Sequence, residues 1–395
     1  MPLDPSLTLD PTSGDGDSAD GEAGKPLDPR PALCLSGGGY RAMIFHVGAL
    51  WRLNELGWLS KLGRVSSVSG GSITAGVLAL AWKELAFDPA TGVSAAFDAR
   101  VVQPLRKMAS TGVDVGAVLT GALLPFVTIS DRVAAAYREH LFRKAKLADL
   151  PSDAEGPRFV FNTTSLQTGA LLRFSRPYAA DYHLGQLVEP DIGLAEVVAA
   201  SSAFPPILSP AEVELRGKRW DPEPPPPGMA GYRGRAQLTD GGVYDNLGLE
   251  TVWKRHRLVL VSDGGGAMDS DQHPPTDWAR HTVRVLNIID NQVRSLRKRI
   301  LVDGFKAKLR EGAYWGIRAD QAKYPVKSAI AVPFDRSLKL ANEPTRLARM
   351  DPQVQERLIN WGYAVCDSAM RSHVVEPAAF AKVKGAALPY PNAGV

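Results

Sequence analysis

The sequence predicts an α/β protein, a three-layer sandwich with a mostly parallel central sheet and helices on both faces. Three observations support this. Short apolar runs typical of buried strands alternate along the chain with longer segments of helical periodicity. Turns rich in glycine and other small residues lead from several of these strands straight into the next helix, as in βα units. With 395 residues, 45% of them hydrophobic, the chain can fill one large core.

The expected elements alternate in order along the chain. Strands are predicted near residues 32–35, 65–68, 159–165 and 257–262, and helices around 40–56, 70–84, 130–143 and 278–301. Because helices separate most of these strands, we expect the strands to run parallel to one another.

Composition separates two terminal tails from one folded domain. Residues 1–30 are rich in Asp, Gly, Pro and Ser and indicate a disordered acidic tail; residues 31–385 form the predicted domain, and 386–395 a C-terminal tail. Within the domain, 216–235 indicates an exposed proline-rich insertion. The acidic tail carries a net charge of −5, so with a total of +4 the rest of the chain carries about +9. A basic body is attracted to anionic lipid, and equally to nucleic acid.

A serine turn between the second strand and the second helix is the most informative segment. The strand ends at Val68, and Ser69, Gly70 and Gly71 follow before the helical stretch 73–83. A turn of such small residues can be tight enough to present a serine oxygen at the head of a helix, where backbone N–H groups and the helix dipole favour a developing negative charge. Ser69 is therefore a candidate nucleophile. A plain βα turn capped by serine is the alternative.

A glycine loop comes earlier, between the apolar run 32–35 and the first helix. Gly37, Gly38 and Gly39 carry no side chain that would block a ligand, and their N–H groups can converge on an anion. The loop also fits a dinucleotide fingerprint with alanine in its last place. That fingerprint expects an acidic residue at the end of the next strand, which here ends in Ser69 instead. An oxyanion hole that faces Ser69 is therefore the better interpretation.

Two aspartates could accept the proton of the serine. Asp240 follows a short strand and precedes two glycines, and Asp263 follows the strong apolar strand 258–261 and precedes three. Asp-Gly turns are common and explain either residue without a function. Spacing alone leaves Asp240 and Asp263 both open.

With these motifs the chain resembles a known family, the patatin-like phospholipases. The strand and turn 159–169 resemble the family's, and four further blocks occur in the family's order: the glycine loop 36–41, the serine turn 67–72, a proline loop at 200–206 and the Asp-Gly-Gly block 239–246. Together they span residues 33 to 248, a little over half the chain. The sequence departs from the family at Ser67, where glycine is usual.

The resemblance implies a patatin-like fold and a lipid acyl hydrolase, phospholipase A or lysophospholipase in type, with a phospholipid or lysophospholipid substrate. It implies a Ser–Asp dyad in which Ser69 is the nucleophile and Asp240 is its base. Asp263 then only ends a later core strand. The amides of the glycine loop and of Gly70 are expected to hold the oxyanion. We expect Arg41, at the start of the first helix, near that anion or the lipid phosphate, with a surface arginine as the alternative.

Two other functions remain open at this stage. The same dyad would support acyl transfer to an acceptor other than water, and Ser67 alone favours a non-catalytic lipid-binding protein. We expect no cofactor and no nucleic-acid partner, and the sequence does not define the oligomeric state.

Histidines bear on the choice between a dyad and a triad. A conventional serine hydrolase needs a histidine after the acid. The histidines that follow Asp240 lie outside any recognisable catalytic block; they are His256, His273, His281 and His373. His46 is expected in the core. No Cys/His cluster or calcium loop predicts a metal site, and Cys34 and Cys366 are expected to be buried and reduced.

Two segments could contact lipid. The segment 115–129 is nearly all apolar but too short to span a membrane, and it predicts a core or cap helix, or else an acyl-chain channel or lid. The predicted helix 278–301 has apolar residues at helical spacing and basic ones elsewhere, Arg294, Arg297, Lys298 and Arg299. This pattern predicts a solvated basic face, with headgroup binding as the alternative. Because no signal peptide or transmembrane segment is evident, we expect a cytoplasmic protein with peripheral contact to anionic membranes.

Overall fold

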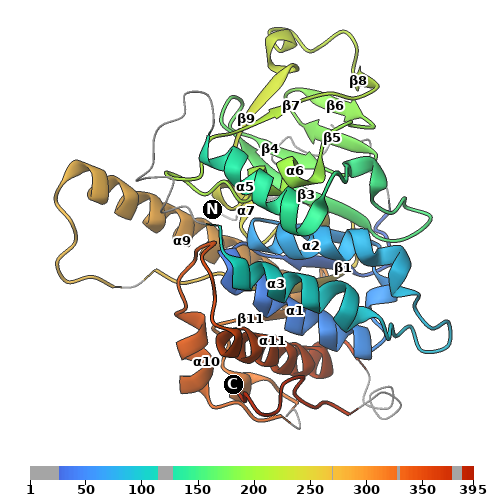
Figure 1. Cartoon of the computed structure of the whole chain (residues 1–395), viewed down its shortest axis with the longest axis vertical. Coiled ribbons are helices and arrows are strands. Elements are labelled where there is room, and N and C mark those ends of the chain that lie inside the picture. Colours follow the sequence, from blue (N-terminus) through green and yellow to red (C-terminus); the bar gives the residue numbers. More distant parts are fainter. Residues whose placement is uncertain (1–25, 114–127, 269, 327–329, 376–384) are drawn as a thin grey trace, which may run out of the picture.

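In the computed structural model, one mixed β-sheet runs between two layers of helices (Figure 1). The structure describes residues 26–113, 128–268, 270–326, 330–375 and 385–395; most of the expected tail 1–30 and of the apolar segment 115–129 lies outside them. The described strands are β1 (Ala32–Leu35), β2 (Arg64–Ser67), β3 (Arg158–Ser165), β4 (Leu171–Phe174), β5 (Tyr178–Asp181), β6 (Gly185–Val188), β7 (Ala211–Glu214), β8 (Arg219–Asp221), β9 (Arg235–Asp240), β10 (Leu258–Asp263) and β11 (Glu311–Gly316). The described helices are α1 (Gly39–Glu55), α2 (Gly70–Ala81), α3 (Gln103–Thr111), α5 (Ile129–Tyr137), α6 (Leu194–Ser201), α7 (Gly242–Asp245), α8 (Glu250–Trp253), α9 (Trp278–Lys306), α10 (Phe334–Ala341) and α11 (Pro352–His373).

The centre of the sheet is parallel. The strand order is β11-β10-β1-β2-β3-β4-β5-β6-β8, and β9 joins it at β3 and pairs with β7. The strands from β11 to β3 pair in parallel, and the strands beyond β3 pair antiparallel. The predicted three-layer α/β fold is confirmed. The expected strands and helices correspond to β1, β2, β3, β10, α1, α2, α5 and α9, with differences of a few residues at their ends.

The two faces of the sheet can be followed along β1. Leu33 and Leu35 belong to a large apolar core beneath α1, α2 and α11. Ala32 and Cys34 belong to a smaller core on the other face, with Leu301 of α9. Successive strand residues point to opposite faces of a sheet, so β1 is buried on both sides, as expected for a central parallel strand.

One edge of β3 pairs with two strands in succession. Its first half pairs with β2, where Ser67 lies opposite Phe161. Its second half pairs with the antiparallel β9, where Asp240 lies opposite Thr163, while β4 pairs with the other edge. Because Phe161 and Thr163 are two residues apart, the ends of β2 and β9 meet roughly 7 Å apart along β3.

Helices α1 and α11 cross in direct contact on one face of the sheet. A Cβ atom added at Gly48 of α1 would lie 1.9 Å from the carbonyl oxygen of Ile359. A Cβ atom added at Gly362 of α11 would lie 2.0 Å from the carbonyl oxygen of Phe45. The crossing therefore leaves no room for a side chain at Gly48 or at Gly362.

The proline-rich stretch and the C-terminal residues both pack on the domain. The stretch 216–235 includes β8, and its Arg233 donates to the carbonyl oxygen of Leu184 at 2.7 Å. On α11, Asn360 donates through Nδ2 to the carbonyl oxygens of Tyr390 at 2.8 Å and Gly394 at 2.7 Å.

Helix α9 turns part of its basic side toward the body of the protein. Arg294 is only 9% exposed. Arg297 forms an ion pair with Glu250 at 2.6 Å, and Lys298 forms one with Asp263 at 2.6 Å. The expectation of a solvated basic face is therefore wrong for Arg294 and Arg297, because carboxylates on the neighbouring elements attract these cations.

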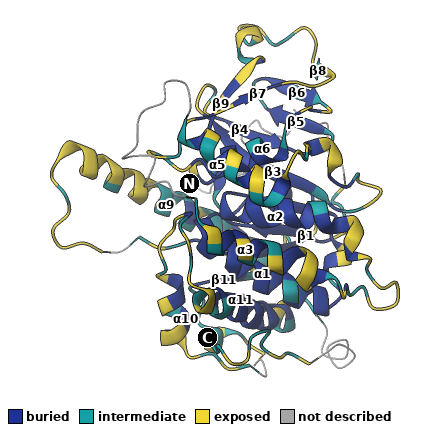
Figure 2. Cartoon of the chain, in the orientation of Figure 1, coloured by how far each residue is buried: buried dark blue, intermediate teal, exposed yellow. Residues whose placement is uncertain are grey.

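The apolar stripe of α9 is exposed in part: Val293 and Ile300 are half-buried. Ile289 and Leu296 are 54% and 50% exposed, and Trp278 at the start of the helix is 83% exposed. Figure 2 shows the outer half of α9 as mostly exposed, and Figure 1 shows it projecting from the body. Periodicity identifies the stripe correctly but does not reveal which face the rest of the protein covers.

We expect Gly48→Ala to destabilise the fold by about 1–3 kcal/mol, because the added methyl group overpacks the crossing of α1 and α11. Helix propensity alone would favour alanine by about 1 kcal/mol, so a loss of stability measured by chemical denaturation is diagnostic of the clash. Gly234→Ala is the control, since a Cβ atom there meets nothing within 4 Å. Equal stability of Gly48→Ala and the unmodified protein would contradict the close crossing.

Candidate active site

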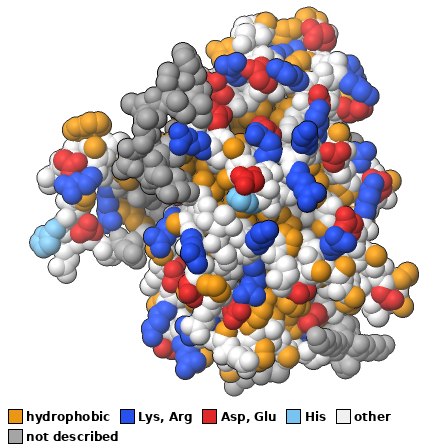
Figure 3. Space-filling model, in the orientation of Figure 1, with side chains coloured by type: hydrophobic (Ala, Val, Ile, Leu, Met, Phe, Trp, Pro, Cys, Tyr) orange, Lys and Arg blue, Asp and Glu red, His pale blue; other side chains and the backbone are white. Residues whose placement is uncertain are grey.

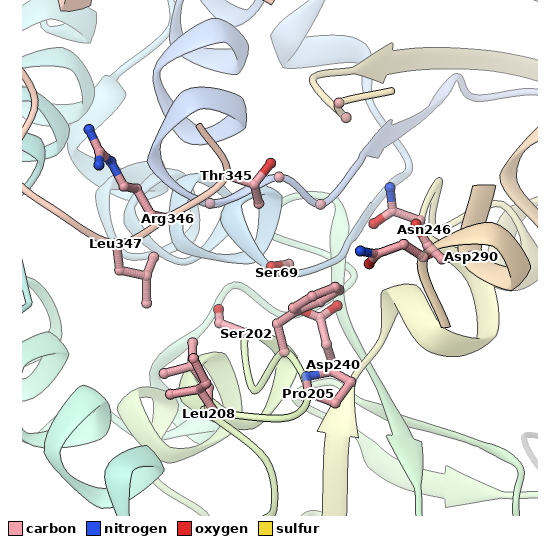
Figure 4. A pocket seen from close by; sticks show the side chains of 18 of the residues that line it. Ser69, Ser202, Pro205, Leu208, Asp240, Asn246, Asp290, Thr345, Arg346 and Leu347 are labelled. Carbon is pink, nitrogen blue, oxygen red and sulfur yellow. The ribbon is translucent and has the colours of Figure 1, made fainter. Parts of the chain in front are cut away.

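Ser69 lies in a strained turn between β2 and α2. Its φ of 52° and ψ of −122° form a backbone conformation that residues with a side chain rarely adopt. Its N–H donates to Ser201 Oγ at 3.0 Å, and the residue lines a cavity (Figure 4). A strand, a strained serine and a helix in succession have the geometry of a nucleophile elbow.

A buried network of hydroxyl groups supports this turn from behind. Ser201 Oγ donates to the carbonyl oxygen of Asn162 at 2.7 Å and bonds to Ser72 Oγ at 2.8 Å. Ser72 Oγ in turn donates to Ser67 Oγ at 3.1 Å, and Ser67 Oγ donates to the carbonyl oxygen of Val160 at 3.2 Å. The Ser67 hydroxyl is therefore hydrogen-bonded within this network, at the position where the family usually has glycine.

The glycine loop leaves amide groups free near Ser69. The N–H groups of Gly38, Gly39 and Gly70 have no acceptor in the described part of the chain. Gly37 lines the cavity but donates its N–H to the carbonyl oxygen of Asn246 at 3.1 Å. The expected set of oxyanion donors therefore narrows to Gly38, Gly39 and Gly70.

The loop and the serine turn touch through their main chains. A Cβ atom at Gly70 would lie 2.1 Å from the carbonyl oxygen of Gly39. A Cβ atom at Gly37 would lie 3.0 Å from Ser69 Cβ and 2.4 Å from Asn246 Oδ1. Glycine at these positions allows the approach that brings the free amides to Ser69.

Asp240 ends β9 beside Ser69 and is buried. Its Oδ1 accepts the N–H of Gly242 at 2.7 Å, whereas its Oδ2 has no hydrogen-bond partner of ordinary length among the described residues. Burial raises the pKa of Asp240 to about 7, and the negative charge of Asp290 adds to the rise. The bond from Gly242 and the nearby Ser69 hydroxyl lower the pKa by a smaller amount. A carboxylate of this kind can take up a proton near neutral pH.

Ser69 and Asp240 lie in a cavity of about 900 Å³ with two unlike walls (Figure 4). One wall comes from the proline loop and from the segment after α10; its apolar residues are Phe204, Pro205, Pro206, Ile207, Leu208 and Leu347, and the segment after α10 also contributes Arg346 and Arg349. The other wall is polar and comes from α9; it includes Arg284, Asn287, Asp290, Asn291 and Arg294. In Figure 4 Ser69 lies between Leu208 and Leu347 on one side and Asp290 on the other.

Arg41 does not lie where the sequence suggested. Its guanidinium is buried behind the glycine loop, where Nε and Nη2 donate to the carbonyl oxygen of Gly264 at 3.2 Å and Nη1 donates to that of Glu343 at 2.5 Å. Burial lowers the pKa of Arg41 to about 10. The expectation that Arg41 faces the reacting anion or a lipid phosphate is therefore corrected. Arg41 ties the loop to neighbouring main chain, and a cation for a phosphate has to come from elsewhere.

Asp263, the other candidate base, is fully engaged. Its Oδ2 bonds to Lys298 Nζ at 2.6 Å and accepts the hydroxyl of Tyr314 at 2.7 Å. Burial raises the pKa of Asp263, but Lys298 and Arg294 outweigh burial and hold the pKa well below its usual range. A carboxylate that stays paired and ionised is a poor proton acceptor.

No histidine is among the described residues that line the cavity. His46 is in the core, as expected: Nδ1 bonds to Ser262 Oγ at 2.8 Å and Nε2 to the carbonyl oxygen of Ser36 at 2.9 Å. Burial lowers the pKa of His46 to about 4, so the ring is neutral. Cys34 and Cys366 are buried free thiols.

The described residues hold neither a metal-binding cluster nor a membrane-spanning helix. They contain no group of three or more His, Cys, Asp or Glu side chains arranged to hold a metal ion. They also contain no helix with the length and apolar character needed to cross a membrane.

On the face seen in Figure 3, Lys and Arg side chains are scattered among acidic ones.

The structure adds residues that sequence reasoning did not single out. Asn246 holds Gly37 through its carbonyl oxygen and points its side chain into the cavity (Figure 4). Ser201 fixes the N–H of Ser69. Both occur inside blocks that resemble the family, so the blocks marked the segments but not these contacts. For Arg294 only the basic run on the helix gave a signal.

A protein-family model matches more than half of the chain. The model described as patatin-like phospholipase matches residues 33–253. A structure of human GIVD cytosolic phospholipase A2 with methyl gamma-linolenyl fluorophosphonate and terbium chloride is similar at 15% identity and a TM-score of 0.47, over 86% of this chain and 57% of that chain. A second structure of the human enzyme is similar at 13% identity and a TM-score of 0.40, over 88% and 59%. VipD from Legionella pneumophila is similar at 15% identity and a TM-score of 0.34, over 88% and 67%. The chain thus spans less than two thirds of the human enzyme's length. No curated protein sequence matches.

We expect the reaction of Ser69 with an organophosphorus reagent to accelerate as the pH rises through about 7, because Asp240 accepts a proton only when ionised. Asp290→Asn should move this midpoint to lower pH, since the charge that helps to raise the pKa of Asp240 is removed. Rate constants for modification between pH 5 and 9 measure both effects. A rate that is flat or falls with pH would exclude Asp240 as the base.

Proposed function

The chain belongs to the patatin-like phospholipase family, and from this premise we propose that it hydrolyses carboxylic esters of lipids. It acts as a phospholipase A or lysophospholipase, on a phospholipid or lysophospholipid. Ser69 is the nucleophile and Asp240 is the base that activates it.

The observation that carries this proposal is a strained serine and a buried carboxylate in one cavity. The carboxylate keeps one oxygen without a hydrogen-bond partner among the described residues, and its pKa of about 7 suits proton transfer near neutral pH. A serine hydroxyl is a weak nucleophile until a base removes its proton. The two groups together meet that requirement.

The reaction follows in two half-reactions. Asp240 takes the proton of Ser69 as Oγ attacks the ester carbonyl, and the proton then passes to the oxygen of the leaving alcohol. The acyl group stays on Ser69. A water molecule next gives a proton to Asp240 and attacks the acyl carbonyl. Asp240 then passes that proton to Ser69 Oγ as the bond between Oγ and the acyl carbon breaks, which releases the fatty acid and restores the serine.

The free amides are suited to the charge that develops on the carbonyl oxygen. Gly38, Gly39 and Gly70 have N–H groups without acceptors in the described part of the chain, and amides at the head of a helix favour an anion. Loss of one such donor typically slows a reaction about 100- to 1,000-fold. The glycine loop is therefore expected to matter nearly as much as Ser69 and Asp240.

The cavity lining supports a lipid as the substrate. Its apolar wall, formed by the proline loop and Leu347, offers an acyl chain a dry surface, and its polar wall on α9 offers a headgroup charged partners. The lack of a histidine among the described lining residues supports a dyad over a triad.

A fluorophosphonate probe should label the unmodified protein but not Ser69→Ala. Asp240→Asn should be labelled roughly 100- to 10,000-fold more slowly, the usual contribution of a general base. Asp290→Asn, which removes another carboxylate from the cavity lining, is the matched control and should still be labelled. Labelling is measured by gel fluorescence and intact mass.

Fatty acid released from a panel of phospholipids and lysophospholipids, measured by mass spectrometry, tests hydrolysis itself. Free fatty acid formed without an added acceptor favours hydrolysis over acyl transfer. Probe labelling of Ser69→Ala would move the nucleophile to another residue. Normal labelling of Asp240→Asn would remove Asp240 from the mechanism.

A further inference from the structure

The polar wall of the cavity contains an arginine whose guanidinium lacks hydrogen-bond acceptors among the described residues. Arg294 of α9 lines the cavity and is 9% exposed. Among the described residues its guanidinium makes no hydrogen bond, and Nε is buried without an acceptor. The carboxylate oxygens facing it are at ion-pair distance only, Asp290 Oδ2 at 3.8 Å and Asp263 Oδ1 at 4.0 Å.

A buried guanidinium of this kind lowers the stability of the fold unless an anion binds it. It has five N–H donors in a fixed fork that matches the oxygens of carboxylates and phosphates. A buried charge without hydrogen bonds destabilises a protein by several kcal/mol unless a partner compensates it. The local structure therefore favours an anion at Arg294.

The neighbouring acids compensate Arg294 incompletely. Asp263 is already bonded to Lys298 and Tyr314 and to the N–H of Gly265. Asp290 is one helical turn away from Arg294 and too distant for a hydrogen bond. An incoming anion thus competes for the guanidinium with Asp290 and, less directly, with Asp263, which has other partners.

The position of Arg294 relative to the reacting atoms suits one end of a lipid. In Figure 4 Leu208 and Leu347 lie on one side of Ser69, and Asp290 of α9 lies on the other. An ester whose acyl chain lies along the proline loop and whose carbonyl reaches Ser69 directs its other end toward α9. Arg41, whose guanidinium is bonded to main-chain carbonyls, is not available there.

We propose that Arg294 binds the phosphate of the lipid headgroup, so that the substrate is a phosphate-bearing lipid rather than a neutral glyceride. This inference rests on the proposed hydrolysis at Ser69. Asp290 opposes it, because its carboxylate competes with the phosphate for the guanidinium. Removal of the two side chains should therefore change phosphate recognition in opposite directions, which a merely structural role would not do.

The test compares two esters with the same acyl chain, a lysophosphatidylglycerol and a monoacylglycerol, both below their critical micelle concentrations. Arg294→Met should lower kcat/KM for the phosphate-bearing ester roughly 10- to 100-fold more than for the neutral one, as expected for loss of a charged hydrogen-bonding partner. Arg294→Lys keeps the charge, so its kcat/KM for the phosphate-bearing ester should lie between that of Arg294→Met and that of the unmodified protein. Asp290→Asn should lower KM for the phosphate-bearing ester. Arg299 is an exposed arginine on the same helix, and Arg299→Met should leave kcat/KM for both esters unchanged.

Equal loss on both esters in Arg294→Met, or no loss on either, would overturn the assignment. Calorimetry with Ser69→Ala measures binding of the phosphate-bearing ester separately from its hydrolysis, since this variant binds the ester without turnover. Lysophosphatidylglycerol should bind Ser69→Ala roughly 10- to 100-fold more tightly than it binds the double variant with Arg294→Met. If that holds while the unmodified protein cleaves neither ester, the phosphate site stands and the proposed hydrolysis fails. Inorganic phosphate that binds as tightly as the lysolipid would mean a site for the free ion and would overturn the headgroup proposal.

Discussion

The candidate site depends on how β3 shares one of its edges. The first half of that edge pairs with β2 and the second half with β9, which runs in the opposite direction. Ser69 follows β2 and Asp240 ends β9, so two segments 171 residues apart in sequence (240 − 69) meet because hydrogen bonds to one strand fix both registers. A slip of one residue in either pairing would turn the following side chains to the other face of the sheet. The geometry of the two groups is thus a property of the sheet, and loops add only the local turn.

Around Ser69, the glycine loop and the serine turn are in contact through main-chain atoms rather than side chains. Gly70 lies against the carbonyl of Gly39, and Gly37 lies against Ser69 and Asn246, at distances that exclude a Cβ atom. The hydroxyl groups behind the turn then hold Ser69 in its strained conformation through Ser201. Strain of this kind persists only where the surroundings over-determine it, and here both sides of the turn are fixed by hydrogen bonds or direct contact.

The sequence predicted the features that local chemistry decides. Apolar runs ended by small residues gave β1 and β2 with their following helices, and the order of the blocks indicated that Ser69 and Asp240 belong together. It did not predict the direction of long side chains. Arg41 turns behind the loop because carbonyl oxygens of distant segments, those of Gly264 and Glu343, accept its hydrogen bonds. Arg294 lines the cavity, with Asp263 of β10 and Asp290 of its own helix at ion-pair distance. Periodicity likewise found the apolar stripe of α9 but assigned the buried side wrongly. The strands β4 to β8 are three or four residues long, too short for a clear alternation.

The crossing of α1 and α11 has a consequence for the order of events during synthesis. The helix that begins at the glycine loop is covered by one that ends at His373, so the ribosome must make the chain as far as His373 before α1 is packed. β10, the neighbour of the central β1, is also made late, beyond the end of the segment that matches the family. A nascent chain that already contains both Ser69 and Asp240 still lacks the support that shapes the loop. The proposed site can therefore take its final shape only after α11 has been synthesised.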